Sequence, residues 1–214
     1  MEKREGQVKD LKEKLETGEI TPKEIKKTLE ERRLTEKAIL KGAAWGYLAW
    51  GILCFLPTVA KFLGLAILSF LTQLAVIKFP AIVIYVSIVL FITAILLTAS
   101  STLYNIKRGG CHSEDETIIL LKRGSYSIVR HPSHVAWSIF LTTIPIILSG
   151  YFSTYVPFTI LSVIGIVAIV AFHYYASLKE ERELDVRKWG DEYREYMKEV
   201  PRWNIFRGLW NLKR

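Results

Sequence analysis

The chain has 214 residues, of which 50% are hydrophobic and 23% are charged, and its formal net charge is +8. All 21 acidic residues and all but two of the 29 Lys and Arg residues lie in three segments, 1–41, 105–131 and 178–214. In each segment the basic residues are interleaved with nearly as many acidic ones, which argues against a nucleic-acid partner. Positively charged loops are typical of the ends of membrane spans. The intervening stretches are apolar enough for helices that cross a hydrocarbon core, so we expect an integral membrane protein.

The first segment, 1–41, is expected to form a polar helical extension. It contains no apolar run like the core of a signal peptide, so we expect no cleaved leader. Gly18 is expected to end a first helix. Thr21-Pro22-Lys23-Glu24 has the capping residue, early proline and glutamate that mark the start of a second one. We expect this extension to be a solvated cap or an arm on the lipid surface rather than part of a catalytic site.

Candidate membrane spans follow in the apolar stretches. They are 42–60, 80–104, 134–150 and 155–177, with a shorter apolar stretch at 62–77. If the shorter stretch crosses the membrane there are five spans; if it is re-entrant or interfacial there are four. The three charged segments contain twelve, five and ten Lys and Arg residues, all of which favour the cytoplasm, and only an even number of spans satisfies them. The predicted fold is an all-α integral membrane protein with four to five transmembrane helices, and four are preferred.

We divide the chain into the extension, membrane helices at 42–104 and a C-terminal core at 105–214. The core consists of a cytoplasmic loop, a transmembrane hairpin at 134–177 and a cytoplasmic tail at 178–214. The two cysteines, Cys54 and Cys111, are too few for a disulfide framework. Cys111-His112 lacks further ligands at metal spacing, so we expect no metal site.

The hairpin is expected to turn near residues 151–155. His134 and His173 are nearly equidistant along the chain from that turn, which should place both imidazoles at one depth. Each begins a stripe of polar side chains at four-residue spacing, with Ser138 and Thr142 on one helix and Ser177 and Glu181 on the other. Polar groups inside a span are costly, so two stripes at one depth indicate a functional site.

Charged residues gather at the cytoplasmic end of the hairpin. Arg130-His131-Pro132-Ser133 predicts a helix start, whose exposed N–H groups can hold a carboxylate. The fork-shaped guanidinium of Arg130 can hold a second one. At roughly 1.5 Å per helical residue, Glu180 and Glu181 are expected about 7 Å further toward water than His131, a spacing that suits a nucleoside-sized ligand.

Four motifs follow one another over about the last 95 residues. They are Gly124-Ser125-Tyr126; Arg130-His131-Pro132-Ser133-His134-Val135-Ala136-Trp137; Glu180-Glu181 with Leu184; and Gly190-Asp191-Glu192-Tyr193-Arg194-Glu195-Tyr196 before Val200-Pro201. In order and approximate spacing they resemble the isoprenylcysteine carboxyl methyltransferases and their prokaryotic membrane relatives. The chain departs from that pattern at His134 and Ala136, where the family typically has tyrosine and glycine, and by one extra residue between Leu184 and Gly190. These departures bear on substrate identity more than on cofactor use.

The resemblance implies S-adenosylmethionine as the methyl donor, held near the cytoplasmic surface. Its expected contacts are Tyr126, His131, His134, Glu180 and Glu181. Arg130 is the candidate for orienting the acceptor during catalysis, and Trp137 and His173 are candidates for lining the acceptor site. A carboxylate acceptor needs alignment and partial desolvation but no general base. An amine acceptor would need one, for which His134 is the candidate.

The expected function is therefore methyl transfer to a lipophilic small molecule or lipidated substrate, with a prenylcysteine-type carboxylate preferred. Such an acceptor could enter from the membrane lipids while the cofactor enters from the cytoplasm, so the active site of this multi-pass protein is expected to face the cytoplasm. Three alternatives stay open: a methyltransferase acting on a phospholipid or other amine, a nicotinamide-dependent membrane reductase, and a membrane binding protein without catalytic activity. Sterol reductases resemble the C-terminal region, which is why the reductase is retained.

Overall fold

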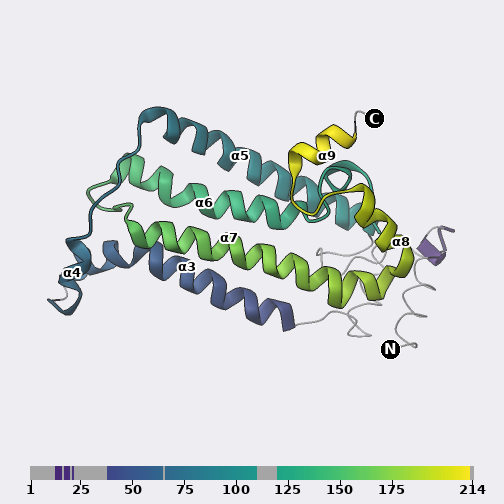
Figure 1. Cartoon of the computed structure of the whole chain (residues 1–214), viewed down its shortest axis with the longest axis horizontal. Coiled ribbons are helices and arrows are strands. Elements are labelled where there is room, and N and C mark those ends of the chain that lie inside the picture. The colour runs from purple at the N-terminus through teal and green to yellow at the C-terminus, as the bar shows by residue number, and fades with distance from the viewer. Residues whose placement is uncertain are drawn as a thin grey trace. The chain divides into compact units, whose positions relative to one another are not determined.

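A computed structural model gives the fold of the chain (Figure 1). The structure describes residues 13–15, 17–19, 21, 38–64, 66–109 and 120–212, apart from the side chains of 38–44, 108–109, 183–184 and 187–188. The helix start expected at 21–24, most of the N-terminal extension and Cys111-His112 lie outside these residues. Gly18 has a positive φ of 77° and follows a helical turn at 13–15, as the sequence predicts.

Within the described part of the chain the secondary structure is helical, and four helices are long and apolar enough to span a membrane. They are α3 (Ala38–Leu63), α5 (Ala81–Tyr104), α6 (Pro132–Phe152) and α7 (Ile160–Glu180). The prediction of an all-α, multi-pass membrane protein is thus confirmed. α3 and α6 extend beyond the predicted spans by a few residues at both ends, and α5 matches its predicted span to within one residue. α7 begins five residues later than predicted and ends three residues later.

The ambiguous stretch at 62–77 does not form a fifth long helix. After Gly64, which has a positive φ of 58°, the chain makes a 3-10 turn, η1 (Ala66–Leu68), and a single helical turn, α4 (Ser69–Thr72). It then runs without regular structure to the start of α5. The preferred number of four spanning helices is confirmed.

The chain divides into two compact units. The first, which we call the membrane unit, contains Ala38–Leu96 and Val135–Tyr175. The second, which we call the site unit, takes in Leu97–His134 and Ala176–Arg214. The site unit therefore includes the second and third charged segments of the sequence.

Small residues allow helices of the membrane unit to approach closely. A Cβ added to Gly165 of α7 would lie 3.0 Å from the sulfur of Cys54 on α3. Between α5 and α6, the rings of Phe91 and Phe140 stack with centroids 4.8 Å apart.

Large apolar side chains point outward from α5, where Ile82, Val89 and Leu96 are each more than 60% exposed. Outward-facing side chains of this kind suit a helix surrounded by lipid tails.

The hairpin connection is longer than predicted, because α6 ends at Phe152 and α7 begins at Ile160. Ser149 closes this connection by accepting a hydrogen bond at its hydroxyl from the Phe158 N–H, at 3.1 Å. Lys61, one of the two lysines outside the charged segments, donates to the carbonyl of Thr154 in the same connection.

The site unit has its own small core. Beyond α7 the chain forms a π-helical turn, η5 (Glu181–Asp185), followed by α8 (Val186–Glu199) and α9 (Ile205–Asn211). Another π-helical turn, η2 (Asn105–Gly109), follows α5, and a 3-10 turn, η4 (Gly124–Ser127), precedes α6. Leu120, Tyr193, Tyr196 and Val200 are buried together, so the last motif of the sequence supplies most of this core.

Candidate functional site

The site is built around the start of α6. This helix begins at Pro132, as the sequence predicts, because proline fits the first helical position without losing a hydrogen bond. Arg130 and His131 precede it and are buried. The Arg130 N–H donates to the carbonyl of Pro201 at 3.0 Å, and its guanidinium Nη1 donates to the carbonyl of Met197 at 3.1 Å. The tail of the chain thereby holds the residues that lead into α6.

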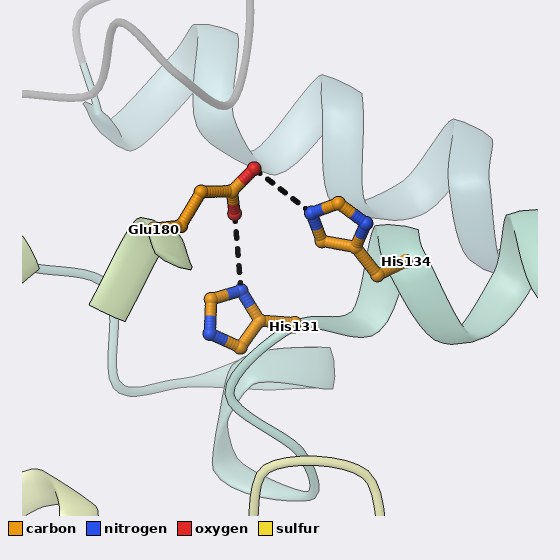
Figure 2. A group of neighbouring side chains, drawn as sticks. All are labelled: His131, His134 and Glu180. Carbon is orange, nitrogen blue, oxygen red and sulfur yellow. Dashed lines mark hydrogen bonds and ion pairs between the residues drawn. The ribbon is translucent and has the colours of Figure 1, made fainter. Parts of the chain in front are cut away.

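Two histidines from the start of α6 meet a glutamate from the end of α7 (Figure 2). His134 Nε2 lies 2.9 Å from Glu180 Oε1. His131 Nδ1 lies 3.4 Å from the other oxygen of the same carboxylate, Oε2. Glu180 thus bridges the two imidazoles, and all three side chains point toward one another.

Glu181 forms the inner part of the cluster. Its Oε1 accepts a hydrogen bond from His131 Nε2 at 3.1 Å and lies 3.0 Å from Arg130 Nε. Its Oε2 accepts a hydrogen bond from Arg202. The Glu181 side chain is 2% exposed, whereas those of Glu180 and His134 are 12% and 17% exposed. The buried carboxylate of Glu181 is therefore fixed by three cationic or hydrogen-bonding groups. Glu180 and His134, which we call the outer pair, are partly exposed.

The protonation of His131 follows from its two partners. Both ring nitrogens face carboxylate oxygens, and both can donate only when the imidazole is protonated. Burial lowers the pKa of His131, but hydrogen bonds to Glu180 and Glu181 outweigh it and raise the pKa to about 9. For Glu181, burial raises the pKa, yet hydrogen bonds from His131 and Arg202 leave it below its ordinary value. At neutral pH the centre of the cluster is thus an imidazolium between two carboxylates.

The structure places the glutamates closer to His131 than the sequence predicts. A separation of about 7 Å along the membrane normal was expected from helical rise, but His131 contacts both carboxylates directly. The long glutamate side chains span the difference. Glu180 ends α7 and Glu181 begins the π-helical turn η5, so the two glutamates lie at the junction of these elements.

Tyr126, another predicted cofactor contact, lies in η4 of the site unit. Its carbonyl accepts a hydrogen bond from the Tyr196 hydroxyl, and its ring stacks on Tyr104 with centroids 6.4 Å apart. The neighbouring Ser125 forms a hydrogen bond of 3.0 Å with Ser101 at the end of α5. These contacts fix the position of η4 within the site unit.

Trp137 and His173, the predicted acceptor residues, belong to the membrane unit. Both contact the ring of Tyr47 on α3, with centroids 6.3 Å and 5.6 Å from it. The sequence therefore selected two residues that share an aromatic neighbour. Tyr47 itself was missed, because an isolated tyrosine in an apolar span has no motif around it.

Sequence reasoning also missed two residues of the site unit. Arg202 follows the Val200-Pro201 motif directly, and that position was the one signal that could have identified it. Asn105 begins η2 and is 1% exposed, and neither atom of its side-chain amide has a hydrogen-bond partner among the described residues. Buried amides are nearly always paired, so Asn105 is suited to a ligand that brings a donor and an acceptor.

Comparison of the chain with models of protein families, with curated proteins and with solved structures gave no match.

Proposed function

We propose that the protein is a membrane methyltransferase that uses S-adenosylmethionine and methylates a lipophilic carboxylate of the prenylcysteine type, with its site facing the cytoplasm. One observation carries the proposal. Residues from two motifs that resemble the isoprenylcysteine carboxyl methyltransferases, at 130–134 and at 180–181, form one connected cluster. Motifs separated by nearly fifty residues have no local reason to meet, so their contact supports a shared role.

The side chains fit the parts of the cofactor. Carboxylates accept hydrogen bonds from ribose hydroxyls, and Glu180 is the more exposed of the two. The first N–H groups of α6, which is 21 residues long, can bind the amino-acid carboxylate through the positive end of the helix. The buried amide of Asn105 has the donor and acceptor that pair with the edge of adenine.

The cofactor would supply a methyl group on a sulfonium, so that one S–C bond breaks as one O–C bond forms at the acceptor carboxylate. The protein needs no general base for an acceptor that is already anionic, and positioning supplies most of the rate. Arg130 is the residue we assign to orienting the acceptor. In this structure its Nη1 donates to the carbonyl of Met197, and its Nε forms an ion pair with Glu181.

Within the cluster we assign different roles to the two glutamates. Glu180 and His134 form the outer pair and would contact the cofactor, whereas Glu181 would position His131 from behind. An acceptor would reach the spans from lipid, and Trp137 and His173 around Tyr47 would line its path in the membrane unit.

Incubation of the purified chain with isotope-labelled S-adenosylmethionine and N-acetyl-S-farnesylcysteine tests the activity. We expect a labelled product that releases methanol in alkali, and none with N-acetylcysteine, which lacks the prenyl chain. An alkali-stable product formed on a lipid amine would favour the N-methyltransferase alternative. Labelling unchanged in Glu180→Gln would contradict the proposed site.

A further inference from the structure

The outer part of the cluster has the composition of a metal site. One ligand atom each from His131, His134 and Glu180 can be chosen so that all three lie within 4.8 Å of one another. Figure 2 shows both imidazoles directed at the carboxylate between them. We propose that these three side chains bind one divalent transition-metal cation of the zinc type, although the sequence alone predicts no metal site.

The distances are close to those that such an ion requires. Zinc bonds to nitrogen and oxygen are roughly 2.0–2.1 Å, which places tetrahedral ligands about 3.3 Å apart. Glu180 Oε1 already lies 2.9 Å from His134 Nε2, and the other oxygen of this carboxylate, Oε2, lies 3.4 Å from His131 Nδ1. Small side-chain rotations would open a space for an ion between the three side chains. The ion would replace the proton that His131 now shares with Glu180.

The second nitrogen of His131 has the partner that metal-binding histidines usually have. Such a histidine donates its other N–H to a carboxylate, which fixes the ring and makes the ligand more basic. His131 Nε2 meets Glu181 at 3.1 Å, and this carboxylate is held in turn by Arg130 and Arg202. His131 Nδ1 is thereby left directed at the ion site.

The donor set favours particular metals. Two imidazoles and one carboxylate suit zinc, copper, nickel or cobalt, whereas calcium and magnesium prefer oxygen ligands alone. Three protein ligands leave a fourth position for water or another ligand. His134 and Glu180 are 17% and 12% exposed, which gives the ion a way in.

Metal binding at these three side chains is independent of the proposed methyltransferase activity. The same side chains are assigned to both ligands, so we expect the metal and the cofactor to exclude one another. The metal would tie the first turn of α6 to the end of α7 when the cofactor is absent.

Cobalt and zinc titrations of the full-length chain, purified in detergent and stripped with a chelator, test the site. We expect zinc to bind with a stoichiometry of one, and cobalt to give the intense visible absorption typical of tetrahedral nitrogen and oxygen ligands. His134→Ala and His134→Gln should both abolish the absorption, and Glu181→Gln should weaken zinc binding about 10- to 100-fold without removing it. His134→Gln keeps a polar side chain beside Glu180, which guards against loss of the fold.

One described histidine outside the cluster supplies a matched control. His173→Ala should bind cobalt as the native chain does, because this residue does not belong to the proposed ligand set. The proposal is overturned if cobalt gives no such absorption, if binding survives in both His134 variants, or if His173→Ala abolishes it. Titration of the metal-free protein with S-adenosylhomocysteine is a separate readout, so failure of the metal site and failure of the proposed function are distinguishable.

Discussion

His131 Nε2 lies 3.1 Å from Oε1 of Glu181, which is itself held by two arginines. The imidazolium can then act as a fixed bridge from the inner carboxylate to Glu180. Glu181 therefore belongs to an inner layer of the cluster that has a structural role. Glu180 and His134 form an outer layer, whose contacts a ligand can replace.

The first prediction concerns stability against pH. The pKa of His131 is raised from its ordinary value near 6.5 to about 9, so its contribution is fully present below 6.5 and is lost as the pH rises through about 9. A shift of that size corresponds to about 3 kcal/mol. We expect the unfolding temperature, followed by intrinsic fluorescence, to fall over this range.

The lowered pKa of Glu181 makes stability depend on pH in the opposite direction, because its contribution is lost at acid pH. Its contribution is present above the ordinary carboxyl value near 4.5 and is lost as the pH falls below it.

The variant His131→Gln is the control for the loss of stability at alkaline pH. Its unfolding temperature should stay constant between pH 6.5 and 9. An equal decline in the variant and in the native chain would remove His131 as its cause.

The second prediction compares the two glutamates. Glu181→Gln leaves the buried Arg130 and the partly buried Arg202 beside a neutral group, and losing one partner of a buried ion pair costs about 3–5 kcal/mol. Glu180→Gln should change stability far less, because its side chain is more exposed. It should instead weaken S-adenosylhomocysteine about tenfold or more, the value of a hydrogen bond to a charged group. If Glu180→Gln were the less stable variant, the assignment of inner and outer layers would be wrong.

The third prediction uses the unpartnered amide. Asn105→Leu removes a buried polar group that has no partner among the described residues, so it should leave the unfolding temperature unchanged or raise it. If Asn105 pairs with adenine, the same variant should bind S-adenosylhomocysteine more weakly, as measured by calorimetry. A loss of stability with unchanged affinity would instead assign Asn105 to packing.

The fourth prediction concerns the docking of α9. A Cβ on Gly208 would lie 1.8 Å from the carbonyl oxygen of Ile128, a backbone atom that cannot rotate away. Gly208→Ala should therefore cost on the order of 1–3 kcal/mol or more, as overpacking does. Gly51→Ala is the matched control, since a Cβ there meets nothing within 4 Å and alanine favours a helix. Equal thermal stability of the two variants would contradict this packing.

The features of the fold that depend on composition and on local residue patterns could be predicted from the sequence. The four spanning helices follow from apolar stretches of sufficient length, and the start of α6 at Pro132 follows from proline chemistry. The preference for four spans over five followed from counting basic residues rather than from the apolar stretch itself.

Other features could not be predicted, because they depend on tertiary contacts. His131 contacts both glutamates directly although they are about fifty residues away along the chain, and no residue pattern marks the π-helical turn that begins at Glu181. The ion pair from Arg202 joins residues 21 apart across α8, whose path depends on the left-handed conformation of Gly190, at φ 57°. The three candidate metal ligands were missed because Glu180 is 46 residues from His134 along the chain.

Calorimetric titration of the purified chain with S-adenosylhomocysteine tests directly whether the cluster binds the cofactor. We expect saturable binding to one site per chain, clearly weakened in Glu180→Gln and in His134→Ala but unchanged in Gly51→Ala. Absence of binding to the folded, metal-free protein, or equal affinity in the native chain and in both site variants, would contradict it.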